Sequence, residues 1–162
     1  MIDLVEIKDV PELLPELKAL LMEYGFYMYD QLGLVAGRNR FFKELKNLSG
    51  ATYQLPSGTF ILAQHNDKIA GCVGIKKFTT NECEMKRMYI RPESRGIGMG
   101  SLLCDYVKKW SKNMGYKKIL LDTNEEMKEA VKLYLKEGFI EIAPYCINKN
   151  DHPVFMEFDL GN

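Results

Sequence analysis

The stretch EMKRMYIRPESRGIGMGSLL, residues 84–103, runs from an expected strand through three glycines in six positions, 95–100, into an expected helix. Glycine adopts left-handed backbone conformations and lets a ligand come close to the main chain. At such a junction the N–H groups of the first helical turn lack intrahelical partners, and the positive end of the helix dipole adds to them. The stretch therefore predicts an anion site suited to a phosphate or pyrophosphate. The alternative interpretation is a tight turn that binds nothing.

The spacing of these glycines narrows the choice of ligand. A nucleotide-binding P-loop ends in Gly-Lys-Ser or Gly-Lys-Thr, whereas Gly100 is followed directly by Ser101. A dinucleotide fingerprint is favoured by Asp122, which ends the next expected strand at the distance of a ribose-binding acid. Against it, Ser101 stands where that fingerprint has its last glycine, and no second nucleotide-binding half follows. A dinucleotide-binding protein is therefore the less favoured alternative.

Upstream of the glycines, the hydrophobic pattern changes to a period of two. Three segments have this pattern and are joined by short turns: TFILAQ (59–64), KIAGCVGIKKF (68–78) and ECEMKRMYI (82–90). They predict an antiparallel meander. Simple alternation along the third strand puts four side chains on one face of the sheet, those of Glu84, Lys86, Met88 and Ile90.

Downstream of the glycines, helical and strand patterns alternate. An apolar stripe over 99–110 predicts a helix, and the apolar run in KKILLD (117–122) predicts a buried strand. Thr123 with Glu126 resembles a capping box for a second helix, which ends at Gly138. Two further strands are expected around 139–143 and 154–160.

The N-terminal part predicts a strand and two helices. IDLVEIK (2–8) alternates as a strand does, and Asp9 is placed to cap a helix, although Pro15 is an alternative helix start. The aromatic segment 25–34 is irregular. The basic segment 37–48 predicts a helix whose charged side chains we interpret as a solvated face rather than a binding patch.

The order of elements is therefore strand, two helices, three strands, helix, strand, helix and two strands. This order predicts a mixed α/β fold with helices on both faces of one sheet. The 162 residues suffice for one hydrophobic core, and no repeat or linker composition divides them. We expect a single domain over 1–162.

Composition disfavours several classes of partner and location. Lysine plus arginine and aspartate plus glutamate both number 22, so the formal net charge is zero, and we expect neither nucleic acid nor a membrane as partner. The first residues lack the features of a secretory signal, and no stretch approaches the roughly 18 apolar residues of a membrane span. The four cysteines lie far apart, with only two histidines to join them. We therefore expect reduced thiols, no metal site and a cytoplasmic location.

Three stretches resemble the GNAT superfamily of acetyl-CoA-dependent N-acyltransferases. They are EMKRMYIRPESRGIGMGSLL (84–103), KILLDT with EAVKLYLKEGF (118–139), and PYCINKNDHPVFMEFDL (144–160). Arg95, Gly98 and Gly100 fit the family signature Arg/Gln-x-x-Gly-x-Gly/Ala. The resemblance implies a GNAT-like fold, a mainly antiparallel central sheet flanked by helices, in which the strand before the glycines splays from the KKILLD strand.

The resemblance also implies acetyl-CoA as acyl donor and the residues that hold it. The backbone of the glycine stretch would cradle the pyrophosphate, and the backbone of the preceding strand would pair with the pantetheine arm. The implied coenzyme-binding residues are Met88, Tyr89, Ile90, Arg95, Gly96, Ile97, Gly98, Met99, Gly100 and Ser101. Many relatives carry an asparagine where this chain has Met127. Asn124 therefore either contacts the coenzyme from a different position or caps the following helix.

Two side chains are the implied catalytic groups. Tyr134 falls at the tyrosine of the family and would protonate the departing thiolate, which a phenol of reference pKa about 10 can do while un-ionised at pH 7. The alternative is that Tyr134 only continues the apolar stripe of its helix. Glu84 lies four residues before Met88, where histone acetyltransferases of the family carry an acidic base. It is interpreted either as that base or as an ion-pair partner on the sheet, and a backbone N–H near Met88 would stabilise the oxyanion.

The sequence thus predicts an N-acetyltransferase that moves acetyl from acetyl-CoA to a primary amine by direct attack in a ternary complex. The acceptor, whether a small molecule, an amino acid or a protein amine, is left open. Five aromatic residues are candidates for its pocket, and equally for the core or a homodimer surface: Tyr24, Phe26, Tyr27, Tyr29 and Tyr145. The rival interpretation from another class is a non-catalytic acyl-CoA-binding or interaction module with the same fold.

Overall fold

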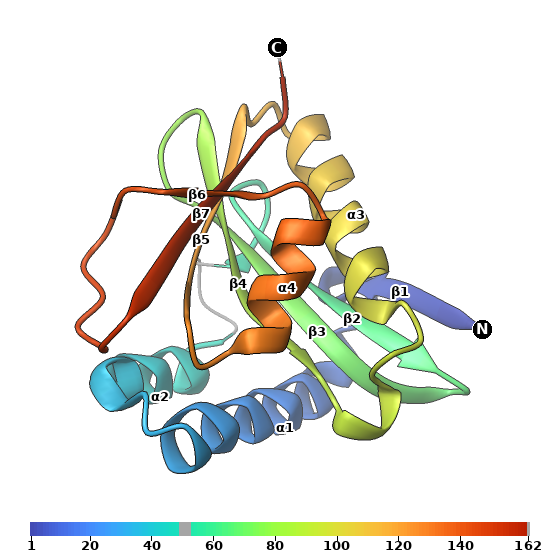
Figure 1. Cartoon of the computed structure of the whole chain (residues 1–162). Helices are drawn as coiled ribbons and strands as arrows, with labels where there is room; N and C mark the ends of the chain where they lie inside the picture. Colours follow the sequence, from blue (N-terminus) through green and yellow to red (C-terminus); the bar gives the residue numbers. More distant parts are fainter. Residues whose placement is uncertain (49–52, 162) are drawn as a thin grey trace.

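The computed structural model describes residues 1–48 and 53–161, which form a seven-stranded sheet covered by helices (Figure 1). The strand order is β1-β2-β3-β4-β5-β7-β6, and only β4 and β5 pair in parallel within the described part of the chain. The strands are β1 (Ile2–Glu6), β2 (Thr59–His65), β3 (Lys68–Lys77), β4 (Glu82–Ile90), β5 (Lys118–Asn124), β6 (Ile140–Ile142) and β7 (Pro153–Asp159). The helices are α1 (Leu14–Gly25), α2 (Arg38–Lys46), α3 (Met99–Asn113) and α4 (Lys128–Lys136).

The helices divide between the two faces of the sheet, and each face has its own core. On one face Leu103 of α3 and Tyr134 of α4 pack against strand residues. On the other face Leu17 of α1 and Phe41 of α2 do the same, and in Figure 1 these two helices lie along the lower side of the sheet. The predicted mixed fold, mainly antiparallel with helices on both faces, is confirmed.

The predicted meander is confirmed as β2, β3 and β4. Asn66 and Asp67 form the turn between β2 and β3, and both have positive φ, 52° and 62°. Two left-handed residues in a two-residue turn match the right-handed twist of the flanking strands, and asparagine and aspartate tolerate that conformation.

The two parallel strands separate soon after they meet. Residues 82–84 of β4 pair with 118–120 of β5, and beyond them both strands continue without pairing to each other. The predicted splay is therefore confirmed. It opens the middle of the sheet between the last residues of β4 and those of β5.

A bulge in β4 contradicts the simple alternation expected for this strand. Cys72 pairs with Tyr89 and Gly74 with Lys86, so one residue of β3 faces both Arg87 and Met88. Arg87 has a φ of 59°, in the left-handed region. A bulge adds one residue to the strand and shifts the side-chain pattern by one position. Before the bulge, odd positions of β4 face α3 and α4; after it, even positions do.

The bulge therefore separates side chains that were expected together. Glu84 and Lys86 lie on the α1 and α2 face, whereas Met88 and Ile90 lie on the α3 and α4 face. The expectation of a common face is wrong because an extra residue in the left-handed conformation interrupts the period of two.

Local helix boundaries also differ from the expectation. Helix α1 begins at Leu14 with Pro15 in its first turn, so the alternative start is the correct one. The segment Phe26–Gln31, expected to be irregular, continues α1 as a π-helix. The expected capping box at Thr123 is wrong: Thr123 lies in β5, and α4 starts at Lys128 without a side-chain cap. No helix within 1–48 or 53–161 is long and apolar enough to cross a membrane.

Candidate active site

The glycine stretch connects β4 to α3 through a short 3₁₀ turn at Pro92–Ser94. Gly96 and Gly98 have φ values of 77° and 87°, which side chains rarely adopt, and an added Cβ at either would meet open space. Gly98 is the N-cap of α3 and offers no side-chain cap, so the first N–H groups of this helix lack a capping side chain. These features are those of an anion site built from backbone.

A cleft of about 710 Å³ lies beside this loop, between the end of β4 and α4. Nine of the predicted coenzyme-binding residues line it: Met88, Tyr89, Ile90, Arg95, Gly96, Gly98, Met99, Gly100 and Ser101. Ile97 is not among the lining residues, and its side chain is 45% exposed. We call this space the coenzyme cleft, after the ligand that the sequence resemblance implies for these residues.

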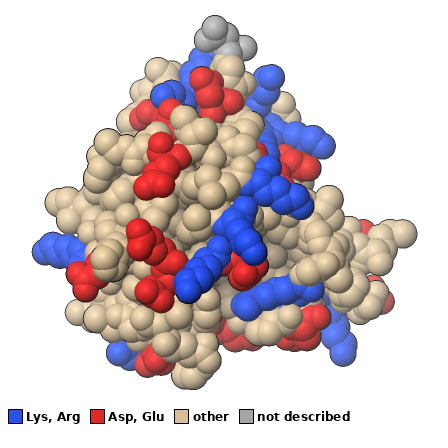
Figure 2. Space-filling model, viewed as in Figure 1, with Lys and Arg blue, Asp and Glu red and all other residues tan. Residues whose placement is uncertain are grey.

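Basic side chains stand along the coenzyme cleft. Lys132 and Lys136 of α4 line it at a spacing of four, which puts them on one side of the helix. Figure 2 shows Lys and Arg side chains in a diagonal line over α4. On the opposite wall, the Arg95 Nε donates to the Ile90 carbonyl at 2.9 Å. The cleft therefore offers positive charge to an anionic ligand.

Gly100 has a packing role that the sequence did not reveal. A Cβ at this position would come within 2.8 Å of the Leu133 Cδ2, although the Gly100 backbone also lines the cleft. The missing side chain lets α3 and α4 approach each other closely. A side chain would thus meet backbone strain at Gly98 and the Leu133 side chain at Gly100.

A second, smaller cavity of about 240 Å³ lies on the other side of the opening between β4 and β5. Its walls come from α1, the segment leading into α2, β4, β5 and the loop before β7. Among the described residues, four line both spaces: Tyr24, Met88, Met127 and Tyr134. The two spaces therefore border on the same side chains, and we call the smaller one the acceptor cavity, after the amine that the sequence resemblance implies.

Tyr134 stands where the two spaces meet. Its side chain is 7% exposed, and its ring packs against Phe139 with centroids 5.9 Å apart. Burial raises the pKa of the Tyr134 hydroxyl above its ordinary value. This hydroxyl consequently remains protonated at neutral pH.

An ion pair lies in the wall of the acceptor cavity. The Lys86 Nζ is 3.0 Å from Asp122 Oδ1, and the Asn148 side-chain amide donates to Asp122 Oδ2 at 3.1 Å. Burial opposes the charge of Asp122, but Lys86 and Asn148 outweigh it and lower the pKa of this carboxyl. Asp122 therefore stays ionised and is a weak base.

Glu84 is buried at the far end of this ion pair and does not line either space. Its carboxylate lies 3.5 Å from the Lys86 Nζ and 3.7 Å from the Lys76 Nζ. It also accepts a hydrogen bond of 2.8 Å from the Tyr145 hydroxyl. These contacts are those of the ion-pair partner that was one of the two expectations for Glu84.

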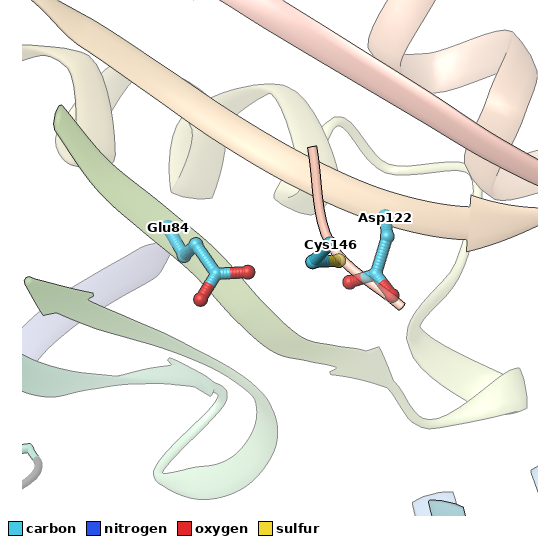
Figure 3. A group of neighbouring side chains, drawn as sticks. All are labelled: Glu84, Asp122 and Cys146. Atoms are coloured by element: carbon cyan, nitrogen blue, oxygen red, sulfur yellow. The ribbon is translucent and has the colours of Figure 1, made fainter. Parts of the chain in front are cut away.

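Figure 3 shows Glu84, Asp122 and Cys146, whose ligand atoms lie within 4.8 Å of one another. A carboxylate pair with a thiol is a possible donor set for a metal ion. Here, however, the ammonium of Lys86 lies within 3.5 Å of both carboxylates, and that of Lys76 lies 3.7 Å from Glu84, so two cations balance the two carboxylates. We therefore describe the cluster as an ion-pair network.

Arg87 was not anticipated as a site residue. It lines the acceptor cavity, and its guanidinium pairs with Glu44 of α2 at 2.6 Å and lies 4.9 Å from the centre of the Phe41 ring. These contacts hold the bulge of β4 against α2. The sequence has no glycine, asparagine or aspartate at position 87 that would indicate a bulge. For the ion pair a signal was present, because Asp122 is a charged residue at the end of an otherwise apolar strand.

Most of the remaining residues predicted for the site line one or both of the two spaces. Asn124 lines the acceptor cavity rather than the coenzyme cleft, accepts the Glu126 N–H at 3.0 Å and donates to the Asp151 carbonyl at 2.6 Å. Of the five aromatic candidates, Tyr24 and Tyr29 line the acceptor cavity, and Tyr27 lines the coenzyme cleft.

Comparison with known proteins identifies relatives and structural neighbours of this chain. An uncharacterized N-acetyltransferase of Schizosaccharomyces pombe is 33% identical over 154 residues, covering 94% of this chain and 91% of that protein. A GNAT-family acetyltransferase structure from Staphylococcus aureus Mu50 has a TM-score of 0.79 at 24% identity, over 99% of this chain and 100% of the other. The Campylobacter jejuni N-acetyltransferase PseH, solved with acetyl coenzyme A, has a TM-score of 0.62 at 18% identity, over 98% and 99% of the chains.

The family profile covers the coenzyme cleft and most of the acceptor cavity, but not the loop before β7. The profile described as "Acetyltransferase (GNAT) family" matches residues 16–139, from α1 to the end of α4. This range contains the glycine stretch, the splayed strands and Tyr134. The chain therefore belongs to the acetyltransferase (GNAT) family and is an acyltransferase.

Proposed function

We propose that this acyltransferase moves acetyl from acetyl-CoA to a primary amine by direct attack in a ternary complex. The observation that carries the proposal is the meeting of two spaces at Tyr134 and Met88, through the opening between β4 and β5. A donor in one space and an acceptor in the other would meet at these residues. The C. jejuni neighbour with acetyl coenzyme A supports this choice of donor.

The coenzyme cleft fits acetyl-CoA by charge and by backbone. Gly96 and Gly98 leave open space where a Cβ would project, and the start of α3 offers uncapped N–H groups to a pyrophosphate. Lys132 and Lys136 add positive charge along the same cleft. Acetyl-CoA supplies the acetyl thioester.

The protein groups at the junction supply the proton and the electrostatic stabilisation. In the proposed reaction the amine nitrogen bonds to the carbonyl carbon, the carbon–sulfur bond breaks, and the leaving sulfur takes the hydroxyl proton of Tyr134. The backbone N–H of Met88, beside the bulge, donates to the carbonyl oxygen as negative charge develops there. The nitrogen gives its surplus proton to solvent, and a solvent proton restores the hydroxyl.

Amine deprotonation requires no side-chain base in this proposal. Among the described residues that line the two spaces there is no histidine, and the lowered pKa of Asp122 makes its carboxylate a weak base. Glu84 is buried and lines neither of the two spaces. We therefore propose that the acceptor binds as the free amine and that Glu84 positions Lys86 and Tyr145.

Direct binding and turnover test this proposal together. Acetyl-CoA and CoA should both raise the melting temperature, since a ligand at 100 times its dissociation constant stabilises by about 2.7 kcal/mol, whereas NAD and ATP should not. An amine panel should then release CoA thiol faster than hydrolysis alone. Binding without amine-dependent release would favour the non-catalytic module, and stabilisation by NAD alone would favour the dinucleotide-binding alternative.

A further inference from the structure

Charged side chains around the acceptor cavity form a network whose charges cancel. Among the described residues of this network, three cations face three carboxylates: Lys76, Lys86 and Arg87 with Glu44, Glu84 and Asp122. Their nitrogen–oxygen distances run from 2.6 to 3.7 Å. The network therefore adds no net charge to the cavity.

Two further cations line the cavity outside this network. Arg40 comes from α2 and Lys149 from the loop before β7, and both side chains are exposed. Neither has a carboxylate within 4.0 Å in the part of the chain that the structure describes. The Ala36 N–H donates to Asn150 Oδ1 at 3.1 Å and ties the two segments together. The mouth of the cavity thus carries a surplus of two positive charges.

The backbone and Arg87 add to this positive field. Gly37, which precedes α2, lines the cavity, and the first turn of α2 has neither an acidic residue nor a side-chain cap. The N-terminus of a helix carries about half a positive charge. The buried Nε of Arg87 has no hydrogen-bond acceptor among the described residues. An anionic group would complement these features, whereas a second ammonium would be repelled.

The size of the cavity limits the acceptor further. Its volume of about 240 Å³ lies below the roughly 300–1,000 Å³ that holds a drug-sized ligand. A small amine fits this space better than a folded protein segment does.

We propose that the acceptor is a small amine that also carries an anionic group, either a carboxylate or a phosphate. The inference rests on the acetyl transfer proposed above and assigns its substrate class. The anionic group lies at the mouth between Arg40 and Lys149, and the amine nitrogen points inward to Tyr134. Arg40 and Lys149 are then specificity-determining residues.

A panel of amines with similar chain length tests the inference. Its members are 4-aminobutanoate, 3-aminopropyl phosphate, butylamine and 1,4-diaminobutane, compared at equal free-amine concentration. One or both anionic amines should exceed butylamine in kcat/KM by about tenfold, and the diamine should fall below butylamine. The better anionic member identifies the group that is recognised. A preference for butylamine or the diamine would overturn the inference.

Charge-removing variants assign the preference to the two cations. The double variant Arg40→Gln with Lys149→Gln should raise KM for the anionic amine about tenfold, while KM for butylamine and acetyl-CoA stays unchanged. The matched control is Lys43→Gln with Lys46→Gln, which removes two exposed charges from α2 outside the cavity. An equal rise of KM in both double variants would contradict the assignment.

Failure of the inference is distinguishable from failure of the proposed function. A protein that binds acetyl-CoA but acetylates none of the anionic amines retains its coenzyme cleft and contradicts the acceptor class. A protein that does not bind acetyl-CoA contradicts the proposed function itself.

Discussion

Tyr134 combines the position and the protonation state that a general acid needs. It lines both spaces of the site, and burial raises the pKa of its hydroxyl, so the proton is present throughout the neutral range. The sequence also predicted that Tyr134 continues the apolar stripe of α4, and its side chain does pack in the core. The structural and the proposed catalytic roles are therefore compatible in one residue.

Tyr134→Phe should lower turnover by about 10²–10⁴ because the leaving thiolate loses its proton donor. The ring and its packing remain, so the dissociation constant of acetyl-CoA should not change. Steady-state thiol release and calorimetric titration measure the two quantities. Tyr116→Phe is the matched control, since its hydroxyl donates to the Ser57 carbonyl away from the site. Equal turnover in wild type and Tyr134→Phe would reject the acid role.

Glu84→Gln should lower the melting temperature markedly and turnover only slightly. The substitution leaves Lys76 and Lys86 without their shared carboxylate, and breaking a buried ion pair costs about 3 kcal/mol. For a chain of this size that corresponds to a melting temperature lower by roughly 6–12 °C. Turnover of the folded enzyme should fall less than about tenfold.

A base role for Glu84 would give the opposite result. Turnover would fall by about 10²–10⁴, and the acidic limb of the pH profile would change. Glu82→Gln is the control, because Glu82 lies on the same strand and has no ion pair among the described residues. Thermal melting and the pH dependence of kcat/KM separate the two roles.

At the scale of single elements, β4 shows what the sequence can and cannot predict. Its existence, its bounds and its pairing with β3 follow from the period of two. The bulge does not, because Arg87 is not a residue type that signals positive φ. It is held there by tertiary contacts with Glu44 and Phe41 of α2, far away in the sequence. For this reason the acceptor side of the site could not be predicted from the sequence.

Helix α3 shows the opposite case. The glycines before it predicted a phosphate-binding helix start, and the positive φ values of Gly96 and Gly98 agree with that prediction. The close packing at Gly100 depends on Leu133 of α4 and therefore could not be read from the local stretch. Local backbone demands are visible in a sequence, whereas contacts between elements are not.

The two ends of α3 allow a controlled test of the glycine stretch. Gly98 and Gly115 have nearly the same φ, 87° and 88°, and a Cβ would meet open space at both. Gly98→Val and Gly115→Val should therefore lower the melting temperature by similar amounts. Only Gly98→Val should abolish acetyl-CoA binding, because its side chain enters the coenzyme cleft. Unchanged affinity in Gly98→Val, measured by calorimetry, would show that the coenzyme binds elsewhere.

At the scale of the whole molecule, the two spaces share four lining side chains among the described residues, and the protonation states of Lys86, Asp122 and Tyr134 beside them are fixed across the neutral range. Burial opposes the charge of Lys86, but Asp122 and Glu84 outweigh it and raise the pKa of this ammonium, while the pKa of Asp122 is lowered. Tyr134 keeps its proton because its pKa is raised. None of these groups changes its charge between about pH 5 and pH 9.

The acceptor itself should consequently set the pH dependence. Below the pKa of the amine, kcat/KM should rise about tenfold per pH unit, because only the free amine attacks. The profile should show no alkaline fall below about pH 10, since the ordinary pKa of tyrosine is about 10 and that of Tyr134 is higher. Two acceptors of different amine pKa should give limbs displaced by that difference. If kcat/KM rose over the same pH range for both acceptors, a side chain of the enzyme would act as the base.

The candidate homodimer surface stays an open alternative, and the cytoplasmic location stays a prediction. The splay and most of the coenzyme cleft followed from motifs in the C-terminal half of the chain, whereas the fold class followed from the order of elements along the whole chain. The acceptor cavity is assembled from α1, α2 and the loop before β7 as well as from β4 and β5. Such an assembly of distant segments leaves no local pattern.

The bulge at Arg87 also makes the two binding tasks of β4 separable for protein engineering. Lys86, before the bulge, lines the acceptor cavity alone, whereas Ile90, after it, lines the coenzyme cleft alone, and Met88 lines both. Libraries that randomise Lys86 and its neighbours on β5 can redirect acceptor choice while Met88 and Ile90 are left untouched. Deletion of Arg87 would remove the bulge and its contacts with Glu44 and Phe41, yet it would keep Glu84, Lys86, Met88 and Ile90 on their present faces.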